Sequence, residues 1–158
     1  MGKVFRQEGI NIDIPFVCET ASTLTAGSMI TLDVSGTNVA RAISGLAEST
    51  GFAGVILETK TAATTGCTLA TEGVFEFLGG PSTTLGFTGI VFSVGAPVYA
   101  ALRNTVRPFS ASASAVTGIN PIGICAFLPS GIQGGATSGT TSRVWVKIMP
   151  FKQMAPQV

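Results

Sequence analysis

Short segments in which apolar and polar residues alternate one by one point this chain towards a β fold. Residues 10–14 read Ile-Asn-Ile-Asp-Ile, and residues 28–34 and 143–148 alternate in the same way. A period of two places every second side chain on one face of a strand, whereas a helix repeats at about 3.6 residues. The pattern predicts strands, and in residues 143–148 it predicts that the two valines and the isoleucine share one face.

Shorter apolar runs occupy much of the remaining sequence. They are rich in Val, Ile, Phe and Thr, and turns with Gly or Pro separate them, as is typical of strands. Residues 41–50 could form a helical turn or two, but Gly45 disfavours a helix by about 1 kcal/mol, so a loop is predicted there. We predict an all-β fold, a compact small antiparallel barrel or sandwich of about eight to ten strands. The shorter runs are residues 15–20, 38–43, 54–59, 73–78, 98–102 and 122–128.

One domain is predicted for residues 1–158, because this length lies within the usual size of a single domain. Residues 1–9 are predicted to form an extended N-terminal arm, and residues 150–158 a C-terminal tail. Two tracts rich in small residues, 108–118 and 129–141, are predicted to be long Gly/Ser/Thr-rich loops.

Charged residues are scarce and unevenly distributed. They make up 11% of the chain, against about 25% in a typical soluble domain, and so few charges favour association between proteins. Residues 1–76 contain all eight acidic residues and four basic ones, a net charge of −4, while residues 77–158 contain five basic residues. These halves either cancel within one fold or form complementary faces on neighbouring subunits. The basic residues are scattered, so no nucleic acid partner is predicted.

The residue types on which most enzymes depend are missing or lack a motif. The chain contains no histidine, which excludes the Ser-His-acid triad and removes the commonest metal ligand. No nucleophile elbow, P-loop or dinucleotide-binding motif occurs. Glu72 and Glu76 are predicted to be solvated carboxylates about 13 Å apart on one strand face, too far apart for a glycosidase pair. We predict no catalytic residue, no cofactor, no metal site and no small-molecule substrate.

Cysteine spacing and hydropathy indicate the compartment. Cys18, Cys67 and Cys125 form no Cys-x-x-Cys pair and are predicted to fill the core as free thiols, which suits synthesis in a reducing cytoplasm. The uncharged residues 77–102 contain Gly and Pro throughout and lack the roughly 20 consecutive apolar residues of a spanning helix. The first residues lack the apolar core of a signal peptide. No membrane association is predicted.

Short landmarks spread over nearly the whole chain occur in a recognisable order. They are Phe-Arg-Gln-Glu-Gly at 5–9, Ile-Asp at 12–13, Ala-Gly-Ser at 26–28 before the strand 29–32, Gly-Phe-Ala-Gly-Val at 51–55, Gly66, Thr-Glu-Gly-Val-Phe-Glu at 71–76, Gly-Ala-Pro-Val-Tyr at 95–99, Ile-Gly-Ile-Cys at 122–125 and Arg-Val-Trp-Val-Lys at 143–147. In this order the chain resembles the family of bacteriophage capsid cement proteins, also called head decoration proteins. Residues 110–115 and 134–141 look like insertions relative to a compact member, and the tail 150–158 extends past the last strand.

The resemblance implies a compact β barrel or sandwich that assembles as a homotrimer on the outer surface of the virion. Such a protein binds where subunits of the major capsid protein meet and reinforces the expanded head against the pressure of the packaged DNA. It implies no catalytic residues.

The N-terminal arm is the candidate partner contact, through Val4, Phe5 and Arg6. We expect the arm to pair with a strand edge of the capsid, where backbone hydrogen bonds supply affinity. The alternative is a frayed chain end, which is common at termini.

Two other functions remain open at this point. Another virion component, such as a tail tube, fibre or minor head protein, would suit the same composition, and its copy number would be far below that of the major capsid protein. An enzyme or small-molecule binder would have to use carboxylates in the mouth of a barrel, and a bound ligand or metal would reveal it.

Overall fold

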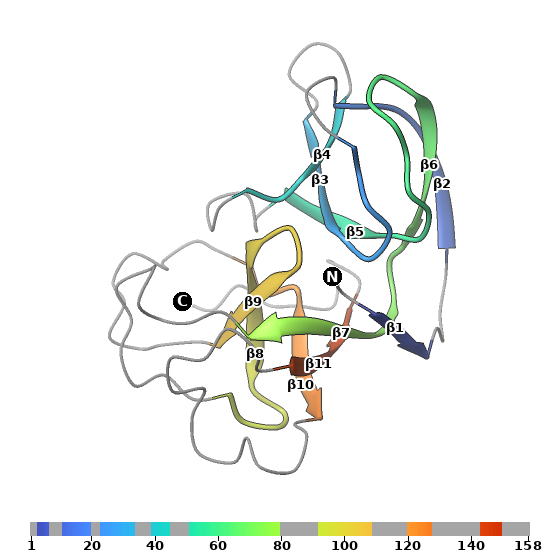
Figure 1. The fold of residues 1–158 in the computed structure, drawn as a ribbon. Coiled ribbons are helices and arrows are strands. Elements are labelled where there is room, and N and C mark those ends of the chain that lie inside the picture. The colour runs from blue at the N-terminus through green and yellow to red at the C-terminus, as the bar shows by residue number, and fades with distance from the viewer. Residues whose placement is uncertain are drawn as a thin grey trace.

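The computed structural model describes residues 3–6, 11–19, 23–33, 39–44, 51–79, 92–108, 120–127 and 143–149. The predicted all-β barrel fold is confirmed, and Figure 1 shows two closed sheets in place of one. The strands are β1 (Lys3–Arg6), β2 (Asn11–Cys18), β3 (Met29–Asp33), β4 (Val39–Ala42), β5 (Phe52–Ile56), β6 (Thr65–Ala70), β7 (Gly73–Gly79), β8 (Pro97–Leu102), β9 (Thr105–Pro108), β10 (Gly123–Phe127) and β11 (Arg143–Ile148).

The first barrel has the strand order β2-β4-β3-β5-β6. Its neighbouring strands are antiparallel except β2 and β4, whose parallel pairing at Val17↔Val39 and Cys18↔Ala40 brings β4 beside β2. Small and branched apolar side chains fill the interior, which is the way narrow barrels are packed. This inner cluster consists of Cys18, Leu24, Ile30, Ala40, Ala42, Ile56, Cys67 and Leu69.

The second sheet has the order β1-β7-β11-β10-β8-β9. A parallel pairing of β9 with the end of β7 closes the strands β7, β11, β10, β8 and β9 into a second barrel. β1 pairs with the other half of the same β7 edge, outside that ring. On β11 the valines and the isoleucine are buried while Arg143 and Lys147 are exposed, so the shared face predicted from alternation is confirmed.

The two barrels are packed on a shared core. It contains Met29, Ile43, Val55 and Ala70 from the first barrel and its flanks, together with buried side chains of β7, β8, β9, β10 and β11, including Phe75 and Phe77. A backbone hydrogen bond from Met29 N–H to the Arg103 carbonyl, 2.6 Å long, also joins them. Figure 1 shows the chain passing from one barrel to the other between β6 and β7.

Several strands differ from the sequence prediction. β2 runs through Pro15, where two separate segments were predicted, because a register shift between Ile14 and Val17 accommodates a residue that cannot donate a hydrogen bond. β6 and β9 were missed, because neither lies in a segment for which a strand was predicted.

Parts of the prediction fall outside the described residues. These are the tail 150–158, the whole tract 129–141, all of the tract 108–118 except Pro108, and most of the segment 41–50, of which Arg41 and Ala42 belong to β4. The side chains of Asn11–Pro15 are also not described, so the predicted face of residues 10–14 stays a prediction. Among the described residues, no helix has the length and apolar character that a membrane span requires.

Candidate interaction surface

The predicted contact residues Val4, Phe5 and Arg6 lie on β1, at the edge of the second sheet. β1 pairs antiparallel with β7 at Val4↔Phe75 and Arg6↔Val74, with an irregularity between them at Phe5. The first residues are thus part of the sheet. The opposite edge of β1 has no partner strand among the described residues. An edge of this kind presents backbone N–H and C=O groups that can pair with another chain.

Beside β1, the outer face of β7 and β11 contains an ion pair. The Arg143 guanidinium Nη1 donates a hydrogen bond to the Glu76 carboxylate Oε1. In the strand register Glu76 lies between Lys3 of β1 and Trp145 of β11. The Glu76 side chain is only 10% exposed and that of Arg143 is 48% exposed. The prediction that Glu76 is a solvated carboxylate is therefore wrong, because its side chain is largely buried and paired with Arg143 of β11.

This ion pair bears on the uneven distribution of charge. Glu76 comes from the acidic half of the chain and Arg143 from the basic half, and their charges cancel within one molecule. A second pair, Glu58 with Lys60 at 2.9 Å, lies within the acidic half. Its hydrogen bond lowers the pKa of Glu58 and raises the pKa of Lys60. At these positions the charges are paired within one chain.

Replacing Arg143 with Met is expected to destabilise the protein by about 1–2 kcal/mol, because it leaves the Glu76 carboxylate largely buried without its cation. The value lies below that of a fully buried pair since Arg143 is half-exposed and solvent weakens the attraction. Urea denaturation of the variant measures the loss. Lys147→Met, an exposed position on the same strand, is the matched control and should change stability by less than about 0.5 kcal/mol. Equal losses in the two variants would contradict the assignment.

An exposed apolar pair lies at one end of the second barrel. Val94 and Phe127 are the large hydrophobic residues that the described part of the chain leaves exposed, at 65% and 56%. Gly95 N–H donates to the Cys125 carbonyl (2.8 Å), and Cys125 N–H donates to the Ala96 carbonyl (2.9 Å). Ala96 N–H donates to the Ser93 carbonyl (3.0 Å), so Val94 lies in a turn just before β8, and the bonds to Cys125 place this turn beside the end of β10, where Phe127 is the last residue. Exposed apolar side chains that gather at one place are typical of protein contacts. The sequence did not single them out, because both belong to apolar runs like those of the core.

All three cysteines are buried free thiols, as predicted. Burial, and next the neighbouring thiol of Cys18, raise the pKa of Cys67 to about 11, while Lys60 opposes the shift. Burial also raises the pKa of Cys125. The Cys67 and Cys125 thiols hold their protons at neutral pH more firmly than an exposed cysteine would, so they are poor nucleophiles.

Stability is expected to fall in alkaline solution, in part because of Cys67. Its pKa is higher in the folded protein than in the unfolded chain, so its contribution is complete below about pH 8.5 and is lost as the pH rises towards 11. Urea denaturation between pH 8 and 11 should show Cys67→Ala losing about 1–2 kcal/mol less stability than the wild type over this range. The same pH dependence in both proteins would rule out this contribution. Cys125 is present in both, so the difference isolates Cys67.

Within the described ranges, no three His, Cys, Asp or Glu side chains are grouped so that they could hold a metal ion. Glu72 precedes β7 and is half-buried. Comparison with protein-family models and with curated proteins found no match.

Proposed function

We propose that this chain is a structural protein without enzymatic activity that binds the outer surface of a bacteriophage capsid and bridges subunits of the major capsid protein. In this role it stabilises the expanded head. The protein would be made in the host cytoplasm and would act as part of the virion, with copies associated as a homotrimer.

The observation on which the proposal most depends is the position of β1. Its three candidate contact residues belong to an edge strand, and the outer edge of that strand has no partner among the described residues. Because β1 lies outside the closed ring of the second barrel, a partner strand could pair with β1 without opening that barrel. A strand added there would bind through backbone hydrogen bonds.

Other features support association in place of catalysis. The sequence has few charges and no histidine. Val94 and Phe127 offer a second place where apolar surface can be buried against a neighbour. Obligate interfaces are larger and more apolar than transient ones, which suits a protein that stays on the particle. The landmarks that resemble the capsid cement proteins include residues of β1, β5, β7, β8, β10 and β11.

The test is co-sedimentation of the purified protein with expanded and with immature phage heads. We expect saturable binding to expanded heads only, at about one copy per major capsid subunit. Deletion of residues 2–7 should weaken binding by at least about tenfold, while Lys147→Ser, an exposed change on β11, should not. Circular dichroism shows whether both variants keep the fold. A monomer that ignores both kinds of head would refute the proposal. Far fewer copies than major capsid subunits would favour a tail or minor head protein.

A further inference from the structure

Three strands of the second barrel present a connected outer face. β10 and β7 pair with β11 on either side, and the register places Ile124 and Val74 beside Lys147. In the next row Phe127 lies beside Trp145. The valines of β11 point into the core, so alternation puts Trp145 and Lys147 on the solvent side of the sheet. These five residues are called the outer face below.

The outer face has the composition of a protein interface. Phe127 is 56% exposed and Lys147 is also exposed, while Val74, Ile124 and Trp145 are half-buried. Aromatic residues are enriched in interfaces, and tryptophan is prominent among the residues that contribute most to binding. Apolar side chains that lie together on an accessible face are typical of a place where another protein binds.

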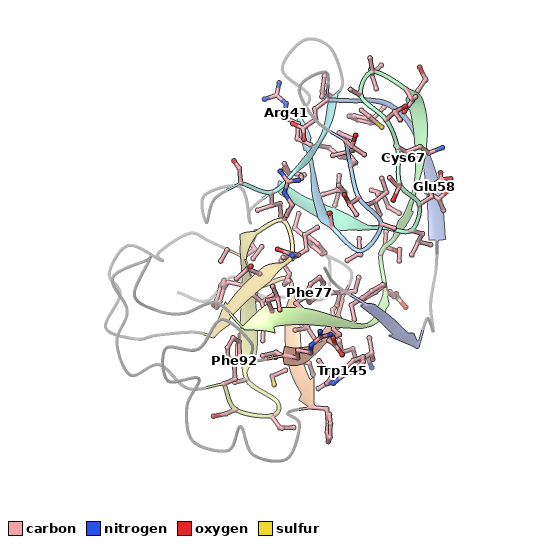
Figure 2. The ribbon with its side chains drawn as sticks, in the orientation of Figure 1. Arg41, Glu58, Cys67, Phe77, Phe92 and Trp145 are labelled. Atoms are coloured by element: carbon pink, nitrogen blue, oxygen red, sulfur yellow. The ribbon has the colours of Figure 1, made fainter. Side chains whose placement is uncertain are left out.

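The charges of the chain are divided between the two barrels. Residues 7–72, which contain all strands of the first barrel, have seven acidic and two basic residues, a net charge of −5. The remaining residues, which contain all strands of the second sheet, have seven basic residues and one acidic residue, a net charge of +6. Figure 2 labels Glu58 on the first barrel and Trp145 on the second. One molecule therefore has an acidic barrel and a basic barrel.

The outer face shares the positive charge of its barrel. Glu76, the only acidic residue outside 7–72, lies beside Trp145 and is paired with Arg143. Among the described residues Lys147 forms no ion pair. The first barrel in turn offers carboxylates at its surface, since the Glu58 side chain is 47% exposed. A partner that binds the outer face would gain from negative charge as well as from apolar contact.

We propose that the outer face of one copy binds the acidic first barrel of a second copy. Opposite charges orient the two molecules, and Phe127 and Trp145 supply the apolar contact. A symmetric contact between two outer faces would instead bring the Lys147 ammonium groups of both copies together, and like charges disfavour this. The charge division thus favours a head-to-tail contact.

A head-to-tail contact determines how copies assemble. The first pair of molecules still has one outer face and one acidic barrel without a partner, so further copies add until a ring closes. A ring of three copies is the proposed homotrimer. The inference rests on the proposed function only in that copies associate. It assigns self-association to the outer face and leaves the outer edge of β1 to the capsid.

Zero-length cross-linking of the wild type tests the contact directly. A carbodiimide joins a lysine side chain to a carboxylate in contact with it. A mixture of unlabelled chains and chains labelled with heavy nitrogen separates links between copies from links within one chain. We expect mixed-isotope peptide pairs that join Lys147 to an acidic residue of 7–72. Mixed pairs that join Lys147 only to Glu76, or no mixed pair at Lys147, would overturn the proposal.

Sedimentation velocity measures the strength of association. Raising NaCl from about 0.05 to about 0.5 M should weaken association by at least about tenfold, because salt screens the charges. Lys147→Glu and Phe127→Ser should each weaken it by at least about tenfold, and circular dichroism shows whether they keep the fold. Arg103→Glu makes the same change of charge at an exposed residue of the turn between β8 and β9 and is the matched control. Equal effects of Lys147→Glu and Arg103→Glu would contradict the assignment, because net charge alone would then drive association.

Binding to phage heads separates this inference from the proposed function. Lys147→Glu should associate weakly with itself and still bind expanded heads, because head binding is assigned to β1. A wild type that stays monomeric would overturn the inference even if it binds heads through the outer face. Self-association through Lys147 without any binding to heads would uphold the inference and refute the capsid function.

Discussion

Phe77→Ala is expected to destabilise both barrels together, by about 3–5 kcal/mol. The Phe77 side chain is fully buried in the shared core, with its ring 6.3 Å from that of Phe75 (centroid to centroid), and Figure 2 labels it on β7. Since the same core includes Met29 and Val55 from the first barrel, the cavity left by the ring would remove contacts from both. A loss of this size is a large fraction of the 5–15 kcal/mol that stabilises a typical domain.

Two measurements separate shared from independent stability. Trp145, the only tryptophan, lies on β11 and reports unfolding of the second barrel by fluorescence. Amide hydrogen exchange on β3 and β5 reports opening of the first barrel. Phe77→Ala should accelerate exchange there and lower the fluorescence midpoint in urea. Phe127→Ala removes the same ring from an exposed position and should cost far less. Unchanged exchange on β3 and β5 in Phe77→Ala would mean that the barrels unfold as separate units.

Alternation predicted the strands well wherever one face of a strand meets solvent. β11 is the clearest example, because its charged residues point outwards and its valines inwards. β3 shows where the rule fails. Met29 and Ile30 are both fully buried, the first in the shared core and the second inside the first barrel. A strand placed between two cores has no solvent face at that point, and a period-two pattern cannot show this.

The number of barrels also depended on information beyond local sequence. β6 and β7 follow each other almost directly in the sequence, yet they belong to different barrels. The barrel that each strand joins depends on the strands with which it pairs. The parallel pairings of β2 with β4 and of β7 with β9 are likewise contacts between strands that are not joined by a hairpin. Turn residues specify hairpins, but they do not specify such non-local pairings.

The candidate surface could be predicted only in part. Val4, Phe5 and Arg6 were predicted as contacts because they precede the first alternating segment, but their pairing with β7 was not predicted. Glu76 and Arg143 are 67 residues apart, so the ion pair between them depends on the register of β7 with β11.

Gly123→Ala is expected to destabilise the second barrel by about 3 kcal/mol, at the upper end of the usual cost of overpacking. A Cβ atom at this position would collide with the Lys147 carbonyl and with Cα of Ile148, which are backbone atoms of β11. Gly123 pairs with Ile148 on one side and with Val98 of β8 on the other, so β10 has no free side towards which it could shift. Relief of the clash would require separation of β10 from β11 and would open the ring.

The matched control is Gly51→Ala, because the added Cβ atom would there meet a side chain, which can move, and not a fixed backbone. There the nearest atom to an added Cβ is the Thr31 hydroxyl at 2.5 Å, the end of a side chain that can rotate away, so the cost should stay below about 1 kcal/mol. Urea denaturation followed by far-UV circular dichroism, which reports on both barrels, compares the two variants. If Gly123→Ala were as stable as Gly51→Ala, β10 and β11 could not lie as close together as this barrel requires. A further substitution, Gly123→Val, should abolish the folded second barrel, because a larger side chain meets the same immovable backbone.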